Sequence, residues 1–156
     1  MNVVLLADIS AIIKNAKASG KKIIATNGCF DILHLGHLHN LEASKAMGDL
    51  LVVGVNSDSS VKKLKGKDRP INSENDRAEL LAALKPVDYV VIFNELDASN
   101  FLRAVQPDIY TKGGDYKPVD LPEYSTVQEI EAKIEIIDLV EGKSTTAMVS
   151  KFATNG

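Results

Sequence analysis

Residues 23–37 read IIATNGCFDILHLGH, and they combine an apolar strand, a loop and the start of a helix. The first four residues form an apolar, largely β-branched run of strand length. From residue 35 to residue 47, apolar side chains recur with the period of a helix, about 3.6 residues. A strand that is apolar on both faces and leads directly into a helix is typical of a parallel sheet covered by helices on each side.

The same alternation continues along most of the chain. Further apolar runs predict strands at residues 50–55, 89–93, 109–112 and 134–139. Helical periodicity is found at residues 73–84, 98–105 and 125–133. Two more helices are expected at residues 10–19, with Ser10 as cap and Gly20 as the closing residue, and at residues 145 to about 152, capped by Ser144. The sequence therefore predicts a Rossmann-like, doubly wound α/β fold, with a five-stranded parallel sheet and helices on both faces.

The composition indicates one ordinary globular domain. The chain has 156 residues, of which 45% are hydrophobic and 25% charged, and we find no internal repeat or low-complexity tract. We therefore expect a single domain over residues 1–156, in which residues 1–20 supply a helix that covers the sheet. In a doubly wound sheet, ligands bind beyond the carboxyl ends of the strands, so the strand-to-helix loops are expected to carry the chemistry.

Other features of the composition exclude several classes of protein. No apolar run approaches the roughly 20 residues that a membrane helix needs. The N-terminus has no basic region before its short apolar segment, which argues against a secretory signal and favours a cytoplasmic protein. Cys29 is the only cysteine, so the chain can form neither an internal disulfide nor a cysteine-rich zinc site. The net charge of −3 provides no general attraction to nucleic acid.

Two familiar phosphate-binding motifs are not satisfied. The dinucleotide pattern G-x-G-x-x-G follows none of the predicted strands. Gly142-Lys143-Ser144 imitates the end of a P-loop, but that motif requires a glycine where Ile137 stands. These absences argue against nicotinamide chemistry and against a Walker-type site.

The segment His34-Leu35-Gly36-His37 offers a different way to bind phosphate. Histidines three residues apart project from the same face of a helix, and Gly36 leaves room for a ligand to approach the backbone. The first turn of a helix also presents free N–H groups and the positive end of its dipole to an anion. A zinc site is an alternative, but it needs a third ligand and more often uses a spacing of four residues. His39 is expected to point elsewhere.

The motifs resemble those of a known superfamily. Residues 26–37, with their H-x-G-H element, resemble the signature of the cytidylyltransferase-like nucleotidyltransferases, and Ser144-Thr145-Thr146 resembles a second element of that group. Residues 55–58, 64–66, 69–72, 108–116 and Arg77 narrow the resemblance to the heptose 1-phosphate adenylyltransferases. This resemblance covers nearly the whole chain from about residue 21 onward.

The resemblance implies a specific reaction. The AMP part of ATP would be transferred to D-glycero-D-manno-heptose 1-phosphate, giving ADP-heptose and pyrophosphate for lipopolysaccharide core or other surface glycans. In many bacteria this activity forms the second half of a protein whose first half is a sugar kinase. The kinase half is missing from these 156 residues, so we expect a stand-alone transferase. Members of the family commonly pair, which makes a homodimer an expectation here.

The resemblance also implies roles for individual residues. Catalytic roles are expected for His34, His37, Lys65 and Thr145. Nucleotide binding is expected for Asn27, Gly28, Phe30, Gly36, Arg77, Lys112, Gly113, Asp115, Ser144 and Thr146. Contact with the acceptor is expected for Cys29, Asp31, Asn56 and Asp58, with Asp31 holding sugar hydroxyls or orienting a histidine. Mg²⁺ is expected as the cofactor, bound through the triphosphate rather than by protein ligands.

Simpler interpretations exist for several of these residues. Lys65 lies in a basic run that could be a solvated helix face, and Arg77 could form a surface ion pair. Ser144 could act only as a helix cap, and the paired glycines at 113 and 114 could form only a turn. Cys29 is expected to pack as a small apolar residue, because no base lies next to it in the sequence.

Two other functions remain open from the sequence. One is a cytidylyltransferase acting on glycerol 3-phosphate or a related phosphate or phosphonate, because spacing does not reveal which base is bound. The other is a module that binds a nucleotide without turnover. Pyrophosphate release with a panel of nucleotides and acceptors distinguishes all three.

Overall fold

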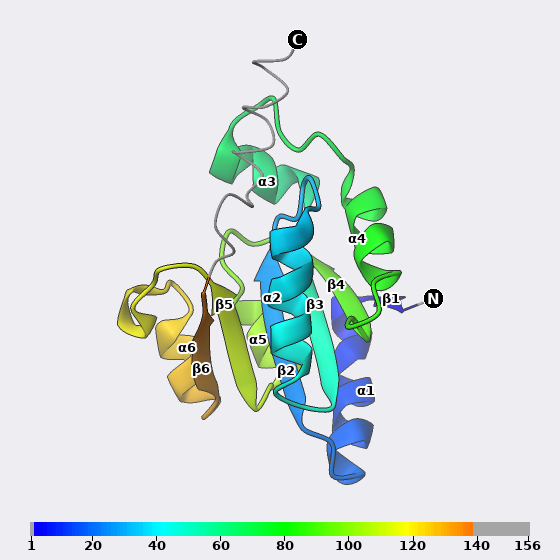
Figure 1. Cartoon of the computed structure of the whole chain (residues 1–156), viewed down its shortest axis with the longest axis vertical. Coiled ribbons are helices and arrows are strands. Elements are labelled where there is room, and N and C mark those ends of the chain that lie inside the picture. Colours follow the sequence, from blue (N-terminus) through cyan, green and yellow to red (C-terminus); the bar gives the residue numbers. More distant parts are fainter. Residues whose placement is uncertain (1, 139–156) are drawn as a thin grey trace.

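The structure, a computed structural model, describes residues 2–138. The described chain is built around a parallel sheet of six strands (Figure 1). These are β1 (Val3–Val4), β2 (Ile23–Gly28), β3 (Leu50–Asn56), β4 (Tyr89–Phe93), β5 (Ile109–Gly113) and β6 (Lys133–Ile137). Their order across the sheet is β1-β4-β3-β2-β5-β6, and all neighbours are parallel. The predicted α/β fold is confirmed.

Helices cover both faces of this sheet (Figure 1). On one face, α1 (Leu6–Ala18), α5 (Ser99–Val105) and α6 (Tyr124–Glu129) pack in a row. The other face is covered by α2 (Leu35–Lys45) and α4 (Glu74–Ala82). Helix α3 (Asp58–Lys65) follows the carboxyl end of β3, and a short 3₁₀ turn, η1 (Pro118–Asp120), precedes α6. None of the helices in the described residues is long and apolar enough to span a bilayer.

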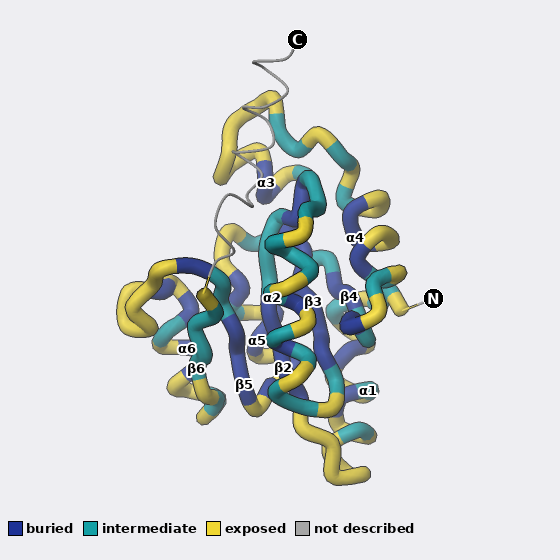
Figure 2. Tube along the Cα trace, viewed as in Figure 1, coloured by how far each residue is buried: buried dark blue, intermediate teal, exposed yellow. Residues whose placement is uncertain are grey.

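Each face of the sheet has its own apolar core. Ile23 and Ala25 of β2 belong to the core beneath α1 and α5, whereas Ile24 between them belongs to the core beneath α2 and α4. This alternation explains why the strands are apolar at nearly every position, and the strands form the buried centre of the molecule (Figure 2). Each fully buried side chain of this kind contributes about 1.5–3 kcal/mol.

The N-terminal segment differs from the prediction. Val3 and Val4 add a sixth strand beside β4, too short to be read from sequence periodicity. Helix α1 begins at Leu6, one turn before the predicted cap, so the prediction for Ser10 is wrong: its hydroxyl donates to the carbonyl of Ala104 at 2.9 Å. Gly20 does take a positive φ of 79° after the helix, as expected.

The helix α3 was not predicted, because lysines and serines hide its periodicity. Ser57 caps it by accepting a hydrogen bond from the Ser60 N–H, and Val61 is its buried apolar anchor. In contrast, α6 is shorter than predicted, since Lys133 already belongs to β6. The helix predicted from residue 145 and the last predicted strand residue, 139, lie outside the described residues.

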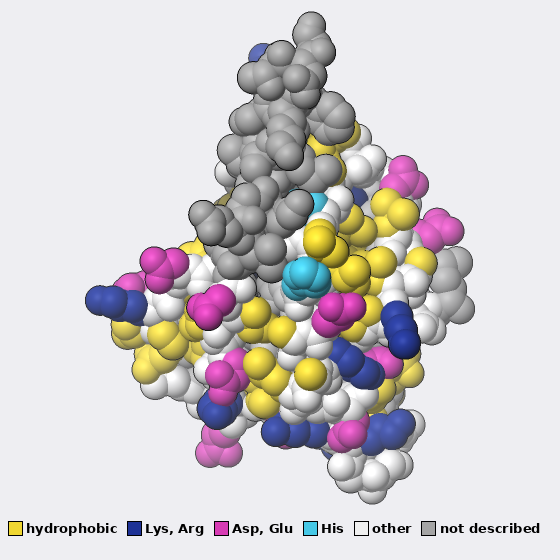
Figure 3. Space-filling model, in the orientation of Figure 1, with side chains coloured by type: hydrophobic (Ala, Val, Ile, Leu, Met, Phe, Trp, Pro, Cys, Tyr) yellow, Lys and Arg dark blue, Asp and Glu magenta, His cyan; other side chains and the backbone are white. Residues whose placement is uncertain are grey.

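The course of the chain creates one switch point in the sheet. From β2 the chain moves to β3 and β4 on one side, and later returns to β5 and β6 on the other. The carboxyl ends of β2 and β5 therefore lie side by side while their following segments diverge. On the face shown in Figure 3, acidic and basic side chains are interspersed, in keeping with the net charge of −3.

Candidate active site

A pocket of about 540 Å³ lies at the switch point, beyond the carboxyl ends of β2, β3 and β5. Nine of the residues predicted for the site line it: Asn27, Gly28, Cys29, Phe30, Asp31, His37, Asn56, Lys65 and Lys112. The structure thus brings together groups from four segments of the chain. The predicted Ser144, Thr145 and Thr146 lie outside the described residues.

Two histidines meet at the start of α2. The rings of His34 and His37 are stacked, with centroids 3.8 Å apart. The backbone N–H of His34 donates to Nδ1 of His37 at 3.3 Å. Because Nδ1 acts as an acceptor, the neutral ring of His37 carries its proton on Nε2. His37 lines the pocket, whereas His34, for which a catalytic role was also predicted, is not among the lining residues and stacks on His37. Gly36 lies between them in the first turn of the helix.

The loop after β2 fits closely against this pair. The ring of Phe30 lies tilted against His37, with centroids 5.3 Å apart, and its backbone has a left-handed φ of 48°. A side chain at Gly28 would place its Cβ 3.1 Å from the Phe30 ring. Gly28 therefore allows Phe30 to support the imidazole, in addition to lining the pocket itself.

The pKa of His37 makes folding stability depend on pH. Burial and the repulsion from His34 lower the pKa of His37 to about 4, against an ordinary value of 6.5. Between these values the unfolded chain binds a proton that the folded chain does not, so stability falls as the pH decreases from 6.5 towards 4. We expect His37→Asn to lose less stability than the unmodified protein over this range, as measured by urea unfolding at pH 4.5 and 7. An identical loss of stability in both proteins between pH 7 and 4.5 would contradict the lowered pKa of His37.

Asp31 is anchored in a way that the sequence did not reveal. Its carboxylate accepts hydrogen bonds from Nε of Arg69 at 2.6 Å and from the backbone N–H groups of Ile71 and Asn72 at 2.9 Å. Burial alone would raise the pKa of Asp31, but these donors outweigh it and hold the pKa below its ordinary value. Asp31 therefore fixes the loop at residues 69–72 and neither orients a histidine nor offers a free oxygen to a sugar, which corrects the predicted role.

Arg69 is the main cationic group that the sequence analysis missed. It lines the pocket beside Lys65 and Lys112. Its Nε is bound to Asp31, and none of the described residues accepts a hydrogen bond from either Nη group. A planar guanidinium held at one edge leaves its other edge for a bidentate anion. Arg69 could have been predicted from the sequence, because it lies in the stretch at residues 69–72 that carries the family resemblance.

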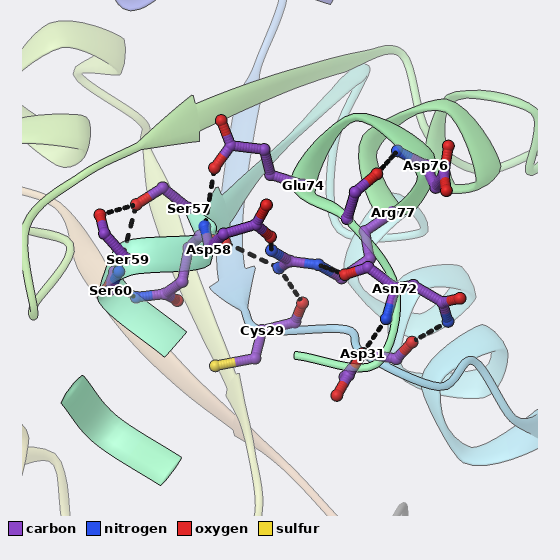
Figure 4. A network of polar contacts seen from close by, with 12 residues as sticks. Cys29, Asp31, Ser57, Asp58, Ser59, Ser60, Asn72, Glu74, Asp76 and Arg77 are labelled. Atoms are coloured by element: carbon purple, nitrogen blue, oxygen red, sulfur yellow. Dashed lines mark hydrogen bonds and ion pairs between the residues drawn. The ribbon is translucent and has the colours of Figure 1, made fainter. Parts of the chain in front are cut away.

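Arg77 has a structural role instead of the predicted phosphate contact (Figure 4). Its side chain is fully buried. Nε donates to the carbonyl of Asn72 at 3.0 Å, and one Nη donates to the carbonyls of Cys29 and Asn56 at 2.7 Å each. The other Nη pairs with Asp58 at 2.8 Å, so Asp58 is occupied by Arg77 and does not line the pocket. Arg77 joins three loops from behind the pocket.

The wall formed by the end of β5 also departs from the prediction in part. Lys112 lines the pocket, and burial lowers its pKa. Gly113 does not reach the pocket: a Cβ there would lie 2.3 Å from the Asn40 amide, so this glycine permits β5 to pack against α2. Asp115 is exposed and also lies off the lining. For Gly113, packing against α2 determines the position, whereas Asp115 lies at the surface.

Cys29 lines the pocket at the end of β2. Burial is the largest influence on its thiol and raises its pKa, although Lys65, Arg77 and Lys112 act in the opposite direction. The protonated thiol is a poor nucleophile, so Cys29 contributes shape to the pocket. Seven further residues line the pocket: Leu64, Leu96, Asp97, Tyr116, Leu121, Pro122 and Glu123. Leu64 and Tyr116 lie in stretches that carried the family resemblance, although no role was predicted for them.

Known proteins resemble this chain over most of its length. The family described as Cytidylyltransferase-like matches residues 25–151. "Bifunctional protein HldE" of Nitratiruptor sp. is 54% identical over 144 residues, and that of Wolinella succinogenes is 48% identical over 143 residues. Each alignment covers 92% of this chain but only 30% and 29% of the relative, so the chain spans less than a third of these proteins.

Two solved structures share the fold. The lipopolysaccharide core biosynthesis protein from Thermoplasma volcanium has a TM-score of 0.64 and 35% identity, and the match covers 78% of this chain and 98% of that one. A pantoate-beta-alanine ligase from Francisella tularensis has a TM-score of 0.63 at 16% identity, covering 88% of this chain and 67% of that one. The second likeness concerns the fold alone.

Proposed function

The chain belongs to the cytidylyltransferase-like family and is a nucleotidyltransferase, and we propose that it transfers AMP from ATP to D-glycero-D-manno-heptose 1-phosphate. ADP-heptose and pyrophosphate are the products. The similarity to bifunctional proteins supports this proposal, because the chain corresponds to only one part of them. The similarity to a lipopolysaccharide core biosynthesis protein supports the glycan pathway. The observation that carries the proposal is the convergence of His37, Lys65, Arg69 and Lys112 on one pocket.

The reaction needs little covalent assistance from the protein. The phosphate of a sugar 1-phosphate has a second pKa of about 6, so its oxygen can attack the α-phosphorus without a strong general base. The protein must instead align two anions and stabilise the charge on the α-phosphate and the departing pyrophosphate. The Nε2–H of His37 would donate to a phosphate oxygen, and the cationic side chains of Lys65, Arg69 and Lys112 line the same pocket.

Mg²⁺, when bound together with the nucleotide, would neutralise part of the charge of the triphosphate. In the part of the chain that the structure describes, no three acidic, histidine or cysteine side chains are grouped to hold a metal ion. Mg²⁺ usually keeps several waters and is bound through one or two carboxylates and the substrate phosphates, so we propose a cation carried mainly by the nucleotide.

Pyrophosphate release tests the proposed function directly. The protein with Mg²⁺ is incubated with ATP or CTP and with heptose 1-phosphate, glycerol 3-phosphate or other sugar phosphates. We expect release with ATP and heptose 1-phosphate. Release only with CTP and glycerol 3-phosphate would instead assign a cytidylyltransferase, and ATP binding without release would indicate a binding module.

Arg69 provides a second prediction about the site. Replacing it with Ala removes the free edge of the guanidinium and is expected to lower kcat/KM by about 10- to 100-fold, the range for a charged hydrogen-bonding group. Arg69→Lys is expected to recover only part of this loss, since an ammonium cannot hold Asp31 and an anion in the same planar arrangement. Lys67→Ala, an exposed change outside the pocket, is the control. Equal kcat/KM for Arg69→Ala and the control would exclude a phosphate contact.

A further inference from the structure

The pocket contains one acidic group that the phosphate chemistry does not use. Glu123 precedes α6 and lines the pocket, yet only 3% of its surface is exposed. Its Oε2 accepts no hydrogen bond from any residue that the structure describes. The ion pairs among these residues also do not include Glu123. The other acidic residues of the lining are engaged: Asp31 binds Arg69, and Asp97 accepts from the Ser99 N–H.

The other oxygen of Glu123 is only partly satisfied. The hydroxyl of Tyr110 lies 3.1 Å from Oε1 of Glu123 and is also hydrogen-bonded to Oδ1 of Asn27. A tyrosine hydroxyl carries one proton, so it can donate to only one of these two acceptors at a time. Burial and the charge of Glu123 raise the pKa of Tyr110, which keeps that proton in place. The carboxylate therefore has more acceptor capacity than its neighbours fill.

This arrangement indicates which chemical groups of a ligand Glu123 can bind. A buried carboxylate oxygen without a donor, such as Oε2 of Glu123, costs free energy, and a ligand that supplies a donor recovers that cost. A phosphate cannot do so, because it would bring a like charge to the carboxylate. A hydroxyl group can, and the neighbouring side chains of Leu121 and Tyr116 offer apolar surface to a ring.

We propose that Glu123 is a specificity-determining residue that accepts a hydrogen bond from a hydroxyl of a sugar ring bound in the pocket. The inference rests on the proposed function, since that reaction brings two such rings to the site. One is the ribose of the nucleotide and the other is the acceptor sugar. The cationic groups then bind the phosphates, while the carboxylate of Glu123 accepts a hydrogen bond from an uncharged hydroxyl of the substrate.

Binding experiments on the unmodified protein provide the first test. Calorimetry with the non-reacting α,β-methylene analogue of ATP is compared with its 2′-deoxy and 3′-deoxy forms, and the acceptor is compared with sugar 1-phosphates that lack single ring hydroxyls. We expect one missing hydroxyl to weaken binding by about 10-fold or more. Equal affinities across both series would overturn the proposal without the need for any variant.

The variant Glu123→Gln identifies the source of the hydroxyl. If Glu123 contacts the ribose, the affinity of the variant for the ATP analogue is about 10-fold lower than that of the unmodified protein. The two proteins then bind the deoxy form that lacks the contacted hydroxyl with equal affinity. If Glu123 contacts the acceptor, the variant keeps its affinity for the ATP analogue and for inorganic phosphate. Its affinity for the sugar phosphate falls. Glu129→Gln, on the exposed side of α6, is the matched control, and thermal unfolding of both variants monitors the fold.

Two outcomes would refute the role of Glu123. One is unchanged binding of both substrates to a folded Glu123→Gln protein. The other is a defect that added Mg²⁺ abolishes, which would place a metal rather than a hydroxyl at the carboxylate. Because binding is measured without turnover, a failure of pyrophosphate release would disprove the proposed reaction and leave the binding result interpretable on its own.

Discussion

Replacing His37 with Ala is expected to lower kcat by about 100- to 1,000-fold, the usual loss when one preorganised donor to a developing charge is removed. The ring is positioned to provide this donor by the hydrogen bond at Nδ1, by stacking on His34 and by contact with Phe30. Because charge on the phosphates grows in the transition state, the loss should fall on kcat more than on KM. The measurement is pyrophosphate release over a range of ATP concentrations.

The control for this experiment lies on the same helix. His39 is exposed and does not line the pocket, so His39→Ala is expected to keep the rate of the unmodified protein. Circular dichroism and thermal unfolding of both variants establish that the fold is retained. A full rate in a folded His37→Ala protein would show that the imidazole has no part in the reaction.

Replacing Arg77 with Ala is expected to reduce the free energy of unfolding by about 3–5 kcal/mol, because the change removes a fully buried side chain and leaves several hydrogen-bond acceptors unsatisfied at about 1–3 kcal/mol each. The change leaves the carbonyl groups of Cys29, Asn56 and Asn72 without their donor. It also leaves Asp58 without its cation. Arg77→Lys is expected to recover little, since three rotating donors on one atom cannot reach four acceptors spread around a plane.

Urea unfolding measures this effect. Arg103→Ala is the comparison, because Arg103 is 47% exposed and its partner Glu129 is 58% exposed, and such pairs contribute at most about 1 kcal/mol. A stable Arg77→Ala protein that has lost only its activity would reverse the conclusion. It would show that the arginine acts on the phosphates, as the family resemblance implies.

The sequence was sufficient where local patterns and burial agree. The strands β2, β3, β4, β5 and β6 are apolar on both faces because each face has its own core, so their positions could be predicted. The loop from Asn27 to His37 could also be predicted as part of the site, since a single strand-to-helix connection places it at the sheet edge. Strand β1 escaped prediction because two residues carry no periodicity.

The site was less predictable where several loops converge. Whether Arg77 faces a substrate or the interior depends on the positions of Cys29, Asn56 and Asn72, which come from three separate segments. A glycine is needed at position 113 because Asn40 on α2 packs against it, and these two residues are more than seventy positions apart in the sequence. Glu123 becomes part of the pocket only because η1 and α6 fold back beside β5. These features depend on tertiary contacts, and no local motif encodes them.

The inward-facing Arg77 has a consequence for redesign of this enzyme. The bonds that hold the three loops together lie behind the cavity, so they do not involve the side chains that contact its contents. Leu96 and Tyr116 line the cavity, are about half exposed and take no part in the hydrogen bonds that Arg77 makes with the three loops. A library of variants at these two positions is therefore a practical starting point for changing acceptor preference, since the scaffold should tolerate the exchange.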